Sequence, residues 1–99
     1  MYEVRVKFDT VGNKDRNFRV NDIVRHFKGN LYRIVTFARN TETREKEVIY
    51  ESLYEGEDGI REVWARPYKM FKEKVDREKY PNVEQEYRME IVGIMDVLK

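Results

Sequence analysis

Short strand-like segments separated by turn signals constrain this chain more than any other feature. Apolar and charged residues alternate from Tyr2 to Phe8, which predicts a half-buried strand. Later segments rich in β-branched and aromatic residues are predicted to be strands as well. They are Val24–Phe27, Leu31–Ala38, Lys46–Tyr54, Ile60–Arg66 and the alternating stretch Tyr87–Ile91. Strands of this length at regular spacing favour a mainly β fold.

Glycine, asparagine and proline mark the connections between these strands. Lys28-Gly29-Asn30 and Asp58-Gly59 contain glycines, which adopt positive φ at low cost, and Asn40–Thr43 is a third turn signal. Pro67 holds the preceding residue extended and fits the start of a helix, so one short helical turn is expected over Pro67–Phe71. Five or six short antiparallel strands with one such turn predict a small SH3-like barrel.

The remaining segments complete a single-domain plan for residues 1–99. Val11–Arg19 and Asp76–Glu86 are polar and are predicted to be loops. Leu31–Ala38 is apolar on both faces and is the candidate for the central strand. The apolar stretch Ile91–Met95 either closes the barrel or forms an edge that pairs with a second copy. A monomer or a weak homodimer is therefore expected.

Composition excludes several classes of protein. The chain has no cysteine, so disulfides, thiolate nucleophiles and thiolate metal sites are absent. Aromatic residues make up 13% of the sequence, which argues against disorder. No apolar run approaches the roughly 18 residues of a membrane span, and the start of the chain lacks the apolar core of a signal peptide. A cytoplasmic protein without membrane partners is expected.

Charge is unevenly distributed although the net charge is only +1. Between Lys14 and Arg33 there are six basic and two acidic residues, whereas Glu42 to Glu62 holds eight acidic and three basic residues. This separation is compatible with an oriented interaction surface. The favoured interpretation is that the charged faces of the strands are simply solvated, because folding can place these segments on opposite faces or pair their charges.

Four short motifs resemble a family of small bacterial domains of unknown function. They are Arg25–Gly29 (R-H-F-K-G) with Tyr32, Ala38–Thr43, Val48–Tyr50 with Leu53-Tyr54, and Trp64–Phe71 (W-x-R-P-x-x-M-F). The resemblance places a family-like core at about residues 21–75 and implies an SH3-type β-barrel. It implies no activity, substrate or catalytic residue. The chain departs from the family in having Asn40 at the position of a second histidine, and it lacks a P-R-F element after Val75.

The constellations needed for catalysis or cofactor binding are missing. A single histidine without cysteine provides too few ligands for a transition-metal site, and no metal is expected. The acidic, glycine-rich stretch 55–59 does not fit a calcium loop, and no phosphate-binding glycine loop is present. Ser52, the only serine, lacks the glycines of a nucleophile elbow. The sequence therefore predicts a protein that is not an enzyme and has no cofactor.

Three residues have both a structural and a functional interpretation. His26 would serve as a base or pH switch, but a structural hydrogen bond to backbone or carboxylate is favoured. Trp64 is favoured as a core residue over a contact residue. Arg66 precedes Pro67 in an extended geometry from which it would bind a carboxylate or phosphate. Its alternative is an intramolecular ion pair, and the acids considered for that pair are Glu42, Glu51 and Glu62.

Two functions remain for the candidate binding residues Arg25, His26, Lys28, Tyr32, Trp64 and Arg66. The favoured one is a module that binds an unidentified protein or peptide. The alternative is single-stranded nucleic-acid binding, in which Tyr32 or Trp64 stacks on bases and the phosphates are bound by Arg25, Lys28, Arg33 and Arg39. A sequence pI of about 7.9 weighs against nucleic acid. Basic residues beside exposed aromatic side chains would favour nucleic-acid binding, whereas neutralisation of these basic residues by Glu51 or Glu62 would weaken this alternative.

Overall fold

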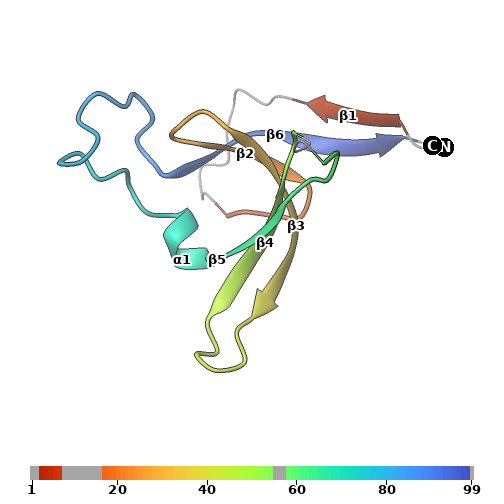
Figure 1. The fold of residues 1–99 in the computed structure, drawn as a ribbon, viewed down its shortest axis with the longest axis horizontal. Coiled ribbons are helices and arrows are strands. Elements are labelled where there is room, and N and C mark those ends of the chain that lie inside the picture. Colours follow the sequence, from red (N-terminus) through yellow and green to blue (C-terminus); the bar gives the residue numbers. More distant parts are fainter. Residues whose placement is uncertain (1–2, 8–16, 55–57, 99) are drawn as a thin grey trace.

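Six antiparallel strands and one short helix form the protein in a computed structural model, which describes residues 3–7, 17–54 and 58–98 (Figure 1). In chain order they are β1 (Glu3–Lys7), β2 (Asp22–His26), β3 (Leu31–Arg39), β4 (Lys46–Ser52), β5 (Val63–Pro67), α1 (Tyr68–Phe71) and β6 (Met89–Leu98). The mainly β class, the antiparallel pairing and the single helical turn are confirmed. The loop predicted at Val11–Arg19 lies largely outside the described residues.

The strands form one sheet in the order β1-β6-β2-β3-β4-β5. β6 lies between β1 and β2, with Ile94 opposite Lys7 on one side and Asp22 on the other. The last strand therefore pairs with the first, and the same strand pairs with β2 over Met89–Ile94. Pairing of Ile91–Met95 with a second copy stays a prediction. Within the described residues β1 and β5 are the two edges, and closure into an SH3-like barrel stays a prediction.

The turns follow the sequence signals closely. Gly29 and Gly59 have φ values of 107° and 75°, as their turns require. The Asn40 side chain shapes the β3–β4 turn, because its Oδ1 accepts the N–H groups of Glu42 at 2.9 Å and Thr43 at 3.0 Å. The start of the fifth strand is predicted less accurately. β5 begins at Val63, three residues after the predicted Ile60, and extends to Pro67.

Phe71 anchors α1 in the core on the inner side of the bent sheet (Figure 1). Its fully buried ring meets Tyr50 edge-on at 5.0 Å and Phe18 at 5.4 Å. The buried core cluster consists of Phe18, Val24, Ile34, Val48, Tyr50, Phe71 and Met89. Trp64 is 47% exposed, so the expectation that it belongs to the core is wrong. The reason is its strand: β5 lies at an edge, where no neighbour covers the outer half of a large side chain.

Replacing Phe71 with alanine should lower the free energy of unfolding by about 3–5 kcal/mol, because the cavity lies where α1, β4 and Phe18 meet. Ile60→Ala is the control, since Ile60 is 62% exposed and its loss should change stability by about 0.5 kcal/mol or less. Urea unfolding followed by circular dichroism measures both. Equal effects of the two substitutions would contradict the core described here.

Candidate functional site

Strand β5 presents Trp64 and Arg66 on the face of the sheet that covers the core. Trp64 lies directly opposite Tyr50, and Arg66 lies opposite Val48. Residues directly opposite each other in an antiparallel pair project to the same face. Tyr50 and Val48 both belong to the core, so the face to which they project is the inner face of the sheet. Trp64 and Arg66 therefore lie on this inner face, at the rim of the sheet.

Two further predicted residues project to this inner face from β2 and β3. Tyr32 packs edge-on against Tyr50, with ring centroids 5.3 Å apart. His26 follows the core residue Val24 by two positions and lies opposite Met89, which is 1% exposed. The structure therefore brings four of the six predicted residues to one face. These four residues, His26, Tyr32, Trp64 and Arg66, are called the inner-face cluster below.

His26 makes the kind of structural hydrogen bond that the sequence favoured. Its Nδ1 accepts the backbone N–H of Lys28 at 3.1 Å, within the turn that ends β2. Its ring also packs on that of Phe27 at a centroid distance of 4.3 Å. Burial, together with the positive charges of Arg66, Lys28 and Arg88, lowers the pKa of His26 to about 4. At neutral pH the ring is uncharged.

Three positive charges act on His26, and one of them, Arg66, has no matching acid among the described residues. Within the described chain, the Arg66 side chain has neither a hydrogen bond nor an ion pair. Its expected pairing with Glu42, Glu51 or Glu62 is therefore wrong. Glu51 instead binds Arg33 at 2.9 Å and lies 4.0 Å from Arg61 on the opposite face of the sheet.

Arg88 is the residue of this region that the sequence did not reveal. In the sequence it is one of the charged residues of the alternating stretch Tyr87–Ile91. Its Nε lies 4.0 Å from Glu73 Oε2, too far for a hydrogen bond, and this buried atom has no hydrogen-bond partner among the described residues. Its proximity to His26 results from the pairing of β6 with β2, which no local sequence signal encodes.

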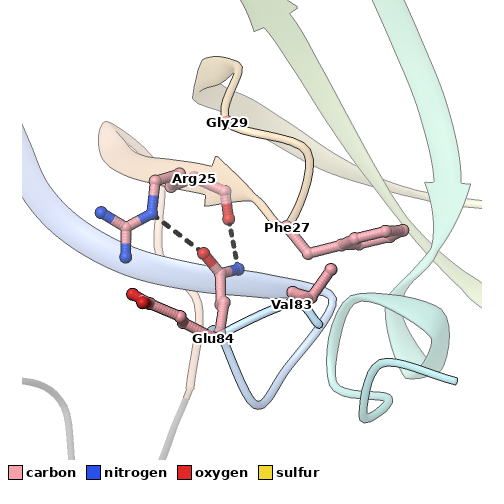
Figure 2. A pocket seen from close by; sticks show the side chains of 6 residues that line it. Arg25, Phe27, Gly29, Val83 and Glu84 are labelled. Carbon is pink, nitrogen blue, oxygen red and sulfur yellow. Dashed lines mark hydrogen bonds between the residues drawn. The ribbon is translucent and has the colours of Figure 1, made fainter. Parts of the chain in front are cut away.

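Arg25 lies away from the inner-face cluster, whereas Lys28 is close enough for its charge to lower the pKa of His26. Arg25 projects to the outer face, where its Nε donates to Gln85 Oε1 at 2.9 Å, and Gln85 Nε2 donates back to the Arg25 carbonyl at 2.8 Å (Figure 2). This reciprocal pair fastens the loop at 76–86 to β2. The Lys28 ammonium lies 5.8 Å from the ring centroid of Phe27 and 5.6 Å from that of Tyr80.

The Arg25–Gln85 contact lines an open pocket of about 310 Å³ (Figure 2). The other lining residues are Phe27, Gly29, Val83 and Glu84. The guanidinium and the loop carboxylate of Glu84 share this pocket, so its charges offset each other. Arg25 therefore acts here mainly as the partner of Gln85.

Comparison with known protein families places the inner-face cluster inside a family match. Residues 22–90 match the family described as "Protein of unknown function (DUF1653)". The chain belongs to this family. The matched region begins within one residue of the predicted family-like core and runs on through the loop to Glu90, so it includes Gln85 and Arg88. Comparisons with curated proteins and with solved structures give no match.

Two further properties of the DUF1653 chain bear on its chemistry. The described residues contain no group of three or more histidine, aspartate or glutamate side chains arranged to hold a metal ion. In the same part of the chain, no helix has the length and apolar character required to cross a membrane. The inner-face cluster thus provides aromatic surface and positive charge.

Replacing Arg66 with glutamine should raise the pKa of His26 above its value of about 4. A nearby positive charge disfavours the imidazolium, so its removal makes protonation easier. The pKa should stay below 6.5, because burial, the largest cause, remains. His26 is the only histidine, so an NMR pH titration of its ring protons gives this value directly. Arg39→Gln is the matched control, and an unchanged pKa in the Arg66 variant would contradict the proximity of the two residues.

Proposed function

We propose that this protein is a non-catalytic binding module that accepts an extended peptide segment of a partner protein along β5. The observation that carries the proposal is the free edge of this strand. Within the described residues β5 pairs with β4 alone, and its other side is open. An edge strand of this kind is the template for peptide binding by strand addition.

The backbone of β5 has hydrogen-bonding groups that point away from β4. The Ser52 N–H donates to the Glu62 carbonyl at 3.0 Å, which fixes this pair as a hydrogen-bonded one. Because such pairs alternate along an antiparallel ladder, Trp64 and Arg66 direct their backbone groups toward β4. Val63 and Ala65 then direct theirs outward, where a peptide backbone would reach them.

Exposed apolar side chains accompany this edge. Val63 is 59% exposed, Trp64 47% and Ile60 62%. Natural proteins usually protect a free edge with charged residues, proline or a covering segment, and in β5 Arg66 and Pro67 occupy only the last two positions. Large apolar side chains along the rest of the edge are typical of a binding surface. Partner binding would bury them.

Single-stranded nucleic acid is supported less well. Arg33 is neutralised by Glu51, and Arg25 is engaged by Gln85 on the face opposite Trp64. Of the basic residues proposed for phosphate contacts, only Lys28 lies close enough to the inner-face cluster for its charge to affect His26. The stacking surface and the phosphate-binding residues are therefore largely separated.

The state of His26 supports binding without catalysis. With Nδ1 occupied by the Lys28 N–H and a pKa near 4, the imidazole is a weak base at neutral pH. We also propose a cytoplasmic location, which the lack of cysteine in so small a chain supports.

Two capped heptapeptides, Lys-Thr-Val-Thr-Glu-Thr-Lys and its Glu→Gln analogue, test strand addition. In titrations of ¹⁵N-labelled protein, at least one should cause saturable amide shifts from Val63 to Arg66. Ala65→Pro should abolish these shifts, because it removes an outward N–H without breaking a bond to β4. Ala65→Val, which keeps the N–H, is the matched control and should retain them.

N-methylated versions of the same peptides provide a test that does not depend on a protein variant. Methylation of alternate backbone nitrogens removes the donors that strand addition needs, so one of the two alternation patterns should prevent the shifts. Absence of shifts with both unmodified heptapeptides would contradict the proposed function.

A further inference from the structure

Trp64 and Arg66 form a pair of recognition positions two residues apart on the same face of β5. Both project to the inner face, as their partners Tyr50 and Val48 show. A peptide strand added along β5 would continue the sheet, so its alternate side chains would project to this face beside them. Side chains two residues apart in the peptide would thus meet Trp64 and Arg66 in turn.

We infer that this surface selects a peptide with an apolar and an acidic side chain two residues apart, the apolar one against Trp64 and the carboxylate against Arg66. This inference rests on the proposed function and specifies its ligand. The ligand is a protein segment, and the recognised group is an aspartate or glutamate side chain.

The charge distribution supports a carboxylate at Arg66. The guanidinium is half-buried at the rim of the core, and it pairs with no acid in the described part of the chain. Lys28 and Arg88 add positive charge on the same side, as their common effect on the pKa of His26 shows. Among the described residues, Glu73 is the one acid that forms an ion pair with any of these three basic side chains, at 4.0 Å from Arg88. A ligand carboxylate would accept two parallel hydrogen bonds from the guanidinium.

The neighbouring residues also favour a single position for the acid. Glu62 precedes Trp64 by two residues, and its carbonyl accepts the Ser52 N–H, so it continues the same alternation. Its carboxylate would repel a ligand acid placed on that side of Trp64. The exposed half of Trp64 offers an aromatic surface to an apolar side chain.

In the heptapeptides Val precedes Glu or Gln by two residues, so a strand parallel to β5 places Val against Trp64 and the Glu or Gln against Arg66. The pair measures the selectivity because the two peptides differ only at this second position. The Glu peptide should bind wild-type protein about five- to tenfold more tightly, as expected for one charge-assisted contact at a partly exposed site. The preference should decrease as salt is raised. NMR titrations give both dissociation constants.

Arg66→Gln should make the two peptides bind equally, whereas Arg66→Lys should keep part of the preference for Glu. Lys79→Gln removes one positive charge from the loop at 76–86 and should leave the preference unchanged. Chemical-shift dispersion equal to that of the wild type confirms that each variant is folded. A preference that persists in Arg66→Gln would overturn the assignment to Arg66.

The outcomes separate this inference from the proposed function. If wild-type protein binds both peptides along β5 with equal affinity, the selectivity is overturned and strand addition stands. If neither peptide binds, both are overturned. A titration with oligothymidylate tests the nucleic-acid alternative. If neither peptide binds and oligothymidylate causes saturable, salt-sensitive shifts of the inner-face cluster, the positive charge serves phosphate recognition instead.

Discussion

The position of β6 between β1 and β2 decides which strands of this sheet keep a free edge. β6 forms backbone ladders with both neighbours, with five residue pairs on each side. The ladder with β6 pairs one side of β2, and the ladder with β3 pairs the other side. The opposite end of the sheet then terminates at β5, whose last residue, Pro67, directly precedes α1. The candidate binding surface exists because of this order.

The same arrangement produces the electrostatic character of the inner face. The pairing of His26 with Met89 brings the start of β6, and Arg88 with it, to the end of β2. The sheet bends so that Arg66 on β5 approaches the same region from the other side, close enough for its charge to lower the pKa of His26. Three basic side chains thus surround one neutral imidazole. Such a concentration of positive charge in a partly buried place favours a negatively charged partner.

Local features of this fold were predictable because their causes are local. Gly29 and Gly59 need positive φ for their turns, and Pro67 sets the start of α1, so each could be placed from two or three neighbouring residues. The exposure of Trp64 could not be predicted, because an edge strand and a central strand have the same composition when only one face is buried. The contact between Arg25 and Gln85 joins residues 60 positions apart. The Arg66 side chain lacks an ion pair with Glu51 because Glu51 binds Arg33 on the other face of the sheet. The exposure of Trp64, the Arg25–Gln85 contact and the unpaired Arg66 side chain all depend on long-range strand pairing.

The central claim is that β5 offers an open backbone edge beside Trp64 and Arg66, and amide hydrogen exchange of the unbound protein tests it most directly. The amides of Trp64 and Arg66 should be protected by β4, whereas those of Val63 and Ala65 should exchange at least about tenfold faster. Addition of the Glu-containing heptapeptide should then slow exchange at Val63 and Ala65. Equal protection of all four amides in the unbound protein would show that the edge is already covered and would contradict the account.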